Sequence, residues 1–272
     1  MKHLKWALAA AMVSVFLGLA PAANAQTGEC SDLNGDGTVD TVSVSGYSVT
    51  VYSGGGTSRT YNITSGWSAM QTVELDGLAG CELLFTQSSS LVVVTHRTGT
   101  TDTYSVGSWS TMAHTDLDGV AGSEVYVTSG SYVNVVTHRT KTRNSYPVGS
   151  WSTLTYRDLD GYAGNELYLT SGTDLKVITQ RTQSLKSYYI GYWSTMQPIE
   201  TDGKTGEELV FTTGATVTIL CHRDAATRAY NVSGWSSMSH YNQDGLAGEE
   251  LVFIMGSRPF VVNDARRTTY YL

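Results

Sequence analysis

Proline, cysteine and charge are all scarce in this sequence. Four prolines and three cysteines occur in 272 residues, and only 15% of the residues are charged. Three cysteines exclude a disulfide-dense scaffold, and the odd number leaves at least one thiol free or paired between chains. A bridge between Cys30 and Cys81 is possible in an oxidising compartment, where it would join neighbouring repeats. Helical periodicity is also absent, which favours an all-β chain.

Catalytic signatures are missing as well. The sequence contains no H-E-x-x-H, no G-x-S-x-G, no P-loop and no paired-cysteine zinc motif. His114 and His240 occupy one equivalent position in two repeats, but neither has an assigned nucleophile or carboxylate. We therefore predict no catalytic residue and a binding module rather than an enzyme.

The first 25 residues have the features of a signal peptide. Lys2 and Lys5 precede an apolar run over residues 6–20, and Ala23-Asn24-Ala25 forms an A-x-A cleavage site. Cleavage after Ala25 predicts a secreted or periplasmic protein without membrane insertion. Loss of the two lysines changes the formal charge from −7 to −9. This acidic balance argues against nucleic acid and favours cations, neutral sugars or basic partners.

A unit of 42 residues recurs six times. The glycine of an acidic turn recurs at this spacing, at Gly35, Gly77, Gly119, Gly161, Gly203 and Gly245. Tryptophan keeps the same step at Trp67, Trp109, Trp151, Trp193 and Trp235. Arginine follows it at Arg97, Arg139, Arg181 and Arg223. A fixed period of this length is typical of solenoids and propellers.

Each unit reads as four short strands with Gly, Asp and Ser between them. The second and third strands carry nearly unbroken apolar runs, which predicts that both faces of each sheet are covered. We therefore predict an all-β, six-bladed β-propeller over residues 26–272, with termini that meet. The expected blades are about 26–66, 67–108, 109–150, 151–192, 193–234 and 235–272. An open β-solenoid would need capping repeats, and neither end is interpreted as a cap.

The first turn has the oxygen spacing of a calcium site. It reads D-L-N-G-D-G-T-V-D, so that side-chain oxygens fall at positions one, three, five and nine, and position seven can offer its carbonyl. The predicted ligands are Asp32, Asn34, Asp36, Thr38 and Asp40. An EF-hand is excluded, because Ser43 stands at position twelve and strands flank the turn.

This turn, repeated around a ring of apolar strands, resembles the FG-GAP/VCBS repeats of integrin-type propellers. The resemblance implies calcium in the turn between the first and second strands of a blade. The other five turns depart from the motif, since position five has lost its carboxylate and position nine has changed from aspartate to glutamate. They are predicted as weaker Ca²⁺ sites or as turns capped without metal. Their residues are Glu74, Asp76, Glu82, Asp116, Asp118, Glu124, Asp158, Asp160, Glu166, Glu200, Asp202, Glu208, Asn242, Asp244 and Glu250.

The tryptophans lie at the linkers between blades. An indole there either stacks on a sugar ring, which makes the five tryptophans candidate ligand residues, or packs as a wedge between blades. The sequence thus predicts a multivalent glycan-binding or cell-surface-binding module of lectin or adhesin type. Two alternatives stay open: a polysaccharide-acting enzyme on the same frame, and a structural or protein-binding propeller.

Overall fold

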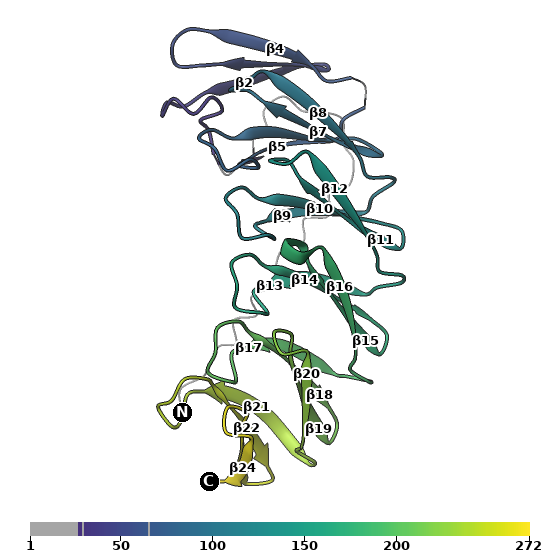
Figure 1. The fold of residues 1–272 in the computed structure, drawn as a ribbon, viewed down its shortest axis with the longest axis vertical. Helices are drawn as coiled ribbons and strands as arrows, with labels where there is room; N and C mark the ends of the chain where they lie inside the picture. The colour runs from purple at the N-terminus through teal and green to yellow at the C-terminus, as the bar shows by residue number, and fades with distance from the viewer. Residues whose placement is uncertain (1–26, 29, 65) are drawn as a thin grey trace.

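The computed structural model describes residues 27–28, 30–64 and 66–272, and it is all-β apart from one 3-10 turn, η1 (Gln180–Thr182) (Figure 1). The predicted signal peptide lies outside these residues. No helix in the described ranges is long and apolar enough to cross a membrane. Antiparallel pairing of consecutive strands builds six sheets. The predicted blades of propeller type, one per 42-residue unit, are therefore confirmed.

The first three sheets contain twelve of the strands. The first consists of β2 (Thr41–Ser45), β3 (Ser48–Tyr52) and β4 (Ser58–Asn62). The second consists of β1 (Thr27–Gly28), β5 (Ala69–Val73), β6 (Glu82–Thr86), β7 (Ser90–Thr95) and β8 (Thr100–Ser105). The third consists of β9 (Thr111–Thr115), β10 (Glu124–Ser129), β11 (Tyr132–Thr137) and β12 (Thr142–Pro147).

The last three sheets have four strands each. The fourth consists of β13 (Thr153–Arg157), β14 (Glu166–Ser171), β15 (Asp174–Thr179) and β16 (Ser184–Tyr189). The fifth consists of β17 (Thr195–Ile199), β18 (Glu208–Thr213), β19 (Thr216–Cys221) and β20 (Ala226–Asn231). The sixth consists of β21 (Trp235–Tyr241), β22 (Glu250–Met255), β23 (Arg258–Asn263) and β24 (Thr268–Tyr271).

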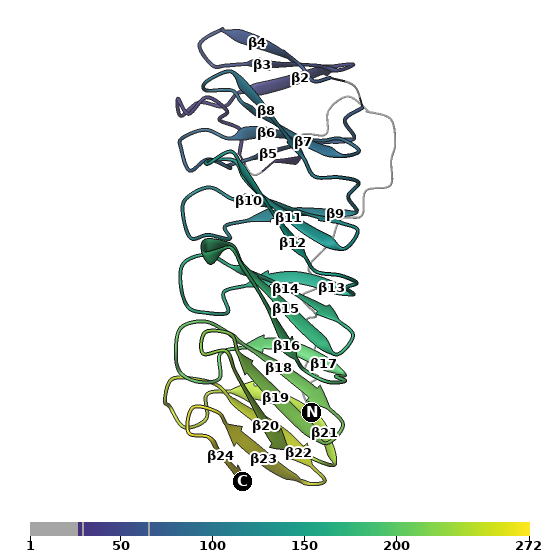
Figure 2. The same ribbon diagram turned by 45° about the vertical axis from the view of Figure 1, so that its right-hand side comes forward.

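The six sheets follow one another as a stack, with the first and the sixth at opposite ends (Figures 1 and 2). Five apolar clusters fill the spaces between consecutive sheets, from the first and second to the fifth and sixth. Among the described residues, no cluster joins the sixth sheet to the first. The predicted closure of the blades into a ring is therefore not observed. The middle strands of the second to fifth sheets have both faces covered, as their apolar runs predicted.

One recurring hydrogen bond likewise joins each sheet only to the next sheet along the chain. Tyrosine at the fourth strand of one sheet bonds to a side chain at the end of the third strand of the next. The pairs are Tyr61–His96 (2.7 Å), Tyr104–His138 (2.8 Å), Tyr146–Gln180 (2.7 Å), Tyr188–His222 (2.8 Å) and Tyr230–Asp264 (2.6 Å). In the last repeat Leu272 takes the place of the tyrosine, so this bond has no sixth copy.

The first sheet is a cap, which corrects the interpretation that neither end resembles one. Residues 41–52 alternate between apolar and polar. Val49 and Val51 face the second sheet and are fully buried. The opposite face is polar, and Thr50 and Thr60 share a hydrogen bond of 2.8 Å across it. A sheet with one wet face ends a stack. Residues 27–28, which the repeat count placed in the first blade, pair in parallel with β5 of the second sheet.

A disulfide bond ties the N-terminal end of the described chain to the second sheet. Cys30 is bonded to Cys81, which is buried in the cluster between the first two sheets. The backbone N–H of Cys81 also donates to the carbonyl of Asp32, at 2.8 Å. Cys221 is buried and unpaired, which accounts for the odd number of cysteines.

Candidate functional site

The acidic turns lie one above another along one side of the stack. In the second turn, Glu74 accepts hydrogen bonds from the backbone of Gly77 (2.6 Å), and Asp76 accepts one from Leu78 (3.0 Å). Glu82 accepts one from Leu75 (2.9 Å). Equivalent bonds recur in the following repeats. The carboxylates thus hold the shape of the turn themselves, as Asp and Asn side chains do in metal-free turns.

Two glycines in each of turns two to five allow neighbouring turns to touch. A Cβ added to Gly77 would lie 2.3 Å from the carbonyl oxygen of Ala121 in the next turn. A Cβ added to Gly80 would lie 2.8 Å from the backbone nitrogen of Gly35 in the preceding turn. Both glycines also have positive φ, at 77° and 100°. The repeated D-G-x-A-G pattern therefore encodes stacking of the turns as well as their local shape.

The glutamate at position nine is buried in repeats two to five. Glu82, Glu124 and Glu208 are at most 1% exposed, and one carboxylate oxygen of each has no hydrogen-bond partner. Burial raises the pKa of Glu82, Glu124 and Glu166 to about 7. Carboxylate oxygens of each of the second, third and fourth turns lie within 4.8 Å of one another. These groups have the composition of a cation site.

The repeated arginine already places a cation in these turns. Arg97 Nη2 lies 2.6 Å from Asp76 Oδ2, and its Nη1 donates to the carbonyl of Ala79 at 2.7 Å. Arg139, Arg181 and Arg223 pair in the same way with the aspartate at position three of their turns, at 2.7–2.8 Å. The guanidinium thus takes a carboxylate and a carbonyl that a calcium ion would use. Turns two to five therefore do not fit the predicted metal.

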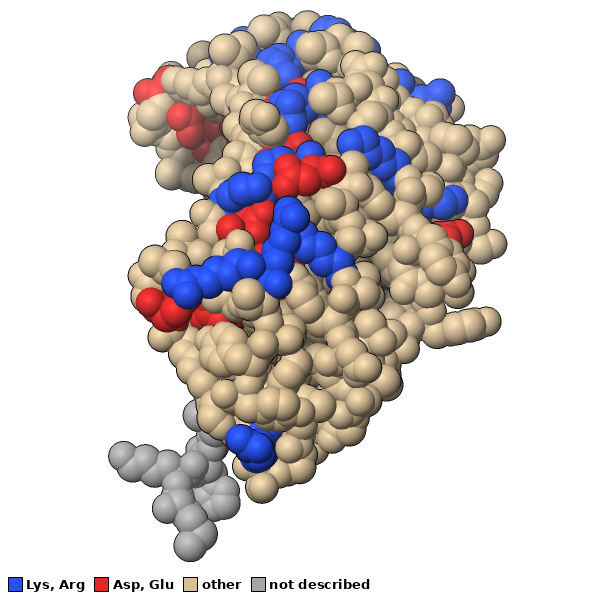
Figure 3. Space-filling model, turned by 60° about the horizontal axis from the view of Figure 1, so that its bottom comes forward, with Lys and Arg blue, Asp and Glu red and all other residues tan. Residues whose placement is uncertain are grey.

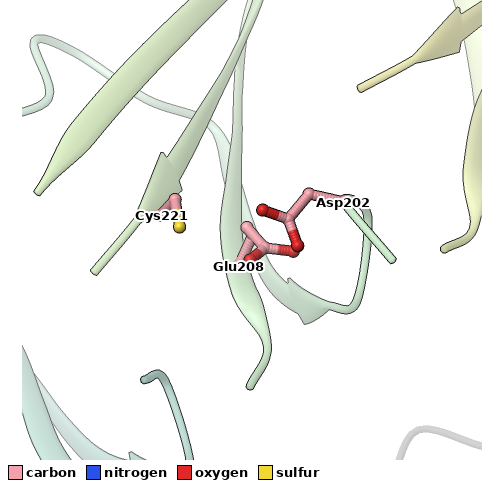
Figure 4. A group of neighbouring side chains, drawn as sticks. All are labelled: Asp202, Glu208 and Cys221. Carbon is pink, nitrogen blue, oxygen red and sulfur yellow. The ribbon is translucent and has the colours of Figure 1, made fainter. Parts of the chain in front are cut away.

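The group in the fifth turn illustrates this arrangement. Asp202 and Glu208 point toward one another, and Cys221 lies on the neighbouring strand β19 (Figure 4). Burial raises the pKa of the Cys221 thiol to about 11, so it stays protonated and is a poor metal ligand. Asp202 is paired with Arg223 at 2.7 Å. In the sixth turn an amide has the same role, since Asn263 donates to Asp244 and Glu250 at 3.1 and 2.8 Å.

The first turn has no internal cation. Gly55 stands 42 residues before Arg97, and Asp40 is 2% exposed with Oδ1 unpartnered. Asp32 receives the backbone N–H groups of Gly35 and Gly37, at 2.7 and 2.8 Å. The buried orphan oxygen and the all-oxygen donor set fit a calcium ion here.

A calcium ion in the first turn would be held by the predicted ligands Asp32, Asn34, Asp36, Thr38 and Asp40. The carboxylates of this turn are not gathered within 4.8 Å, unlike those of the second to fourth turns.

The repeated tryptophans pack between sheets. All five are half-buried, and each lies against one of the five apolar clusters. Trp67 meets Phe85 edge to face at a centroid distance of 5.5 Å, and Trp235 meets Phe253 at 5.6 Å. Trp109 Nε1 donates to the carbonyl of Gln87 at 2.6 Å. These contacts are those of a packing wedge, and stacking of sugars on the indoles stays a prediction.

A polar groove opens between the fourth and fifth sheets. Its volume is about 310 Å³. It lies where two parts of the fourth sheet, its acidic turn and the hairpin between its third and fourth strands, meet the corresponding hairpin of the fifth sheet. The lining residues are Asp160, Tyr162, Thr179, Thr182, Ser184, Lys186, His222 and Arg223. The Tyr162 side chain is exposed, and the guanidinium of Arg181 lies 4.5 Å from its ring centre. Sequence reasoning missed this groove, since Tyr162 stands at position five of its turn, where only the loss of a carboxylate was considered.

His222 closes the floor of this groove as a neutral ring. Its Nδ1 pairs with the Tyr188 hydroxyl at 2.8 Å, and its Nε2 with the Thr179 hydroxyl at 3.1 Å. Burial lowers the pKa of His222 from 6.5 to about 4. Gln180, which occupies the same position one repeat earlier, bonds Tyr146 without a titrating ring.

Stability should therefore depend on His222 in mildly acidic solution. Between pH 6.5 and 4 the unfolded chain binds a proton that the folded chain does not, so the contribution is complete above pH 6.5 and falls as the pH decreases. We expect His222→Gln to reduce the loss of unfolding free energy between pH 7 and 4.5 by about 1–3 kcal/mol. Urea unfolding at both pH values measures it. A variant with the pH dependence of the wild type would contradict the prediction.

Comparison with known proteins shows distant likeness only. No protein-family model and no curated protein matches the chain. Among solved structures, BBS1N in complex with ARL6DN is 10% identical with a TM-score of 0.39, over 88% of this chain and 80% of that one. Streptogramin B lyase is 12% identical with a TM-score of 0.35, over 89% and 84%.

An Agrocybe aegerita lectin that recognises non-reducing terminal N-acetylglucosamine is 12% identical, with a TM-score of 0.43 over 88% of this chain and 77% of the lectin. These three proteins are β-propellers. The TM-scores are all below 0.5, so the likenesses carry no argument about ring closure or function in this chain. The resemblance to FG-GAP/VCBS repeats stays a prediction.

Proposed function

We propose that this protein is an extracellular, non-catalytic module that binds saccharides in the groove between its fourth and fifth sheets. The groove carries the proposal, because one cavity of about 310 Å³ combines the exposed ring of Tyr162, the hydroxyls of Thr182 and Ser184 and the ammonium of Lys186. Saccharide sites pair an aromatic face with a few convergent hydrogen-bonding groups. The disulfide between Cys30 and Cys81 supports a secreted or periplasmic location.

The groove is a single site rather than one of five or six. At the position of Tyr162 the other turns carry Asp36, Leu78, Val120, Lys204 and Leu246. At the position of Lys186, Asn144 and Arg228 stand in the neighbouring repeats, and Arg228 is bound to the buried Asp264. We therefore expect one saccharide per chain, with the first turn holding calcium as a structural ion.

A glycan array followed by calorimetry tests the proposal. We expect a stoichiometry near one and a loss of at least about tenfold in affinity for Tyr162→Ala, since an aromatic platform contributes about 1–3 kcal/mol. Tyr192→Ala is the matched control, because Tyr192 is 85% exposed and outside the groove. The absence of any glycan hit would overturn the proposal. So would binding that survives Tyr162→Ala with a stoichiometry near five, which would point to the tryptophans.

A further inference from the structure

The charges of each repeat are segregated along the chain. Nineteen of the 24 acidic residues lie in the six turns at 32–40, 74–82, 116–124, 158–166, 200–208 and 242–250. The hairpin segments between the third and fourth strands carry the opposite sign. They span 52–61, 95–102, 137–144, 179–186, 221–228 and 263–268 and contain eleven Lys and Arg residues against three Asp. An acidic protein thus has a row of basic hairpins.

The three acidic residues in these hairpins are already neutralised. Asp264 is buried and bonded to Arg228 and Tyr230. Asp102 pairs with Lys141 at 3.1 Å, and Asp224 lies 3.4–3.5 Å from Lys204 and Arg223. The hairpins therefore present a net positive charge to solvent.

Four cations in the same hairpins have no carboxylate partner among the described residues. They are Arg59, Arg143, Lys186 and Arg267, and all four are exposed. Arg143 donates to the carbonyl of Ser105, and Arg59 lies 5.6 Å from the ring centre of Tyr61. We call these four residues the basic edge.

The basic edge runs along the stack. Its members come from the first, third, fourth and sixth sheets, which follow one another in Figures 1 and 2. Stacked sheets lie about 10 Å apart, so the edge spans about 50 Å. On the face drawn in Figure 3, Lys and Arg gather in a band with a few acidic residues between them, and most of the surrounding surface is uncharged. The groove beside Lys186 lies on this edge.

We propose that the basic edge binds a linear anionic polysaccharide bearing carboxylate or sulfate groups. The proposal rests on the saccharide-binding function above, with one sugar unit in the groove and the rest of the chain along the hairpins. Hydroxyl groups line the path between the cations, in the bonded pairs Thr98–Thr100, Thr140–Thr142 and Thr182–Ser184. Single-stranded nucleic acid is less suited, because it requires a series of stacking aromatic rings.

Binding to polygalacturonate, dextran sulfate and neutral dextran of matched length tests this inference. We expect the two anionic polymers to bind and the neutral one not to, with affinity falling at least about tenfold between 20 and 200 mM salt. Lys186→Glu should weaken binding by about tenfold or more, and Lys186→Gln by less. Arg258→Glu is the matched control: Arg258 is exposed, at the opposite hairpin of the sixth sheet, and reversing its charge should change affinity less than about twofold.

The outcomes separate this inference from the proposed function. Equal binding of neutral and anionic polymers would keep the saccharide module and overturn the basic edge. An equal loss with Arg258→Glu and Lys186→Glu would also overturn it, because the effect would then be one of total charge. Competition by an oligothymidylate as strong as that by polygalacturonate would overturn the assignment to saccharides. Circular dichroism of each variant confirms that folding is unchanged.

Discussion

Replacing Gly119 with alanine is expected to lower the free energy of unfolding by about 3 kcal/mol, whereas Gly245→Ala should lower it by only about 1 kcal/mol. The two glycines occupy the same position in the third and sixth turns, with φ of 76° and 75°. The strain of an L-residue at positive φ is therefore common to both substitutions. The difference between the two losses in free energy of unfolding therefore depends only on the contacts of each glycine with the neighbouring turn.

The contacts of the two positions are unlike because the stack is open. A Cβ on Gly119 would lie 2.3 Å from the carbonyl oxygen of Ala163 and 2.7 Å from its Cβ, which would force neighbouring turns apart. A Cβ on Gly245 would meet nothing within 4 Å, because no further turn follows the sixth. Overpacking against backbone adds about 1–3 kcal/mol to the strain at Gly119 alone.

Urea unfolding of the two variants and the wild type provides the measurement. The comparison also tests the arrangement of the sheets, since a closed ring would place the first turn against Gly245 and make the two losses equal. Equal losses of about 3 kcal/mol would thus show that the ends of the stack meet in solution. Losses of about 1 kcal/mol in both would show that the turns do not touch.

The strands and their number were predictable because the repeat is regular. The glycines, the tryptophans and the apolar runs recur every 42 residues. The pattern within each unit predicts one antiparallel sheet. The same regularity also suggested a closed ring, because six complete units are enough to form a six-bladed propeller. Nothing in a count of repeats distinguishes a ring from a stack.

Two local signals for the open ends were nevertheless present in the sequence. Valine alternates with serine or threonine over 41–45 and 48–51, whereas the second and third strands of the later repeats carry nearly unbroken apolar runs. Alternation predicts one solvated face, and therefore an end of the stack. Leu272 replaces the tyrosine that links each sheet to the next, so the last sheet lacks the donor for a sixth link. Both signals occur in a single repeat, so they disappear when the six repeats are described by one common pattern.

The candidate sites were less predictable, since they depend on pairing between segments. The recurring arginines are visible in the sequence, but only the structure shows that each pairs with the aspartate at position three of its turn. That choice decides whether a turn has room for a metal. Net charge was misleading for a related reason, because several turn carboxylates are buried while the four cations of the basic edge are exposed. Counting charge by segment would have revealed the basic edge.

Loss of the disulfide between Cys30 and Cys81 is expected to lower the free energy of unfolding by about 2–4 kcal/mol. The bond closes a loop of 51 residues, for which chain entropy alone gives about 4 kcal/mol. The loop contains the whole first sheet, which packs against one neighbour only. A terminal sheet of a stack has half the interfaces of an internal one, so it is the element that depends most on a covalent tie.

Hydrogen exchange with and without a reductant should locate this loss. Reduction of the wild type should increase exchange over 41–62, because the first sheet opens separately from the rest of the stack. Exchange over 124–171 should not change, since those strands lie between neighbours on both sides. The double variant Cys30→Ala/Cys81→Ala is the control: it should show the reduced pattern in either condition, with the free Cys221 unaffected. Uniform exchange along the chain on reduction would instead mean that the six sheets unfold as one cooperative unit and that the bond stabilises the whole stack.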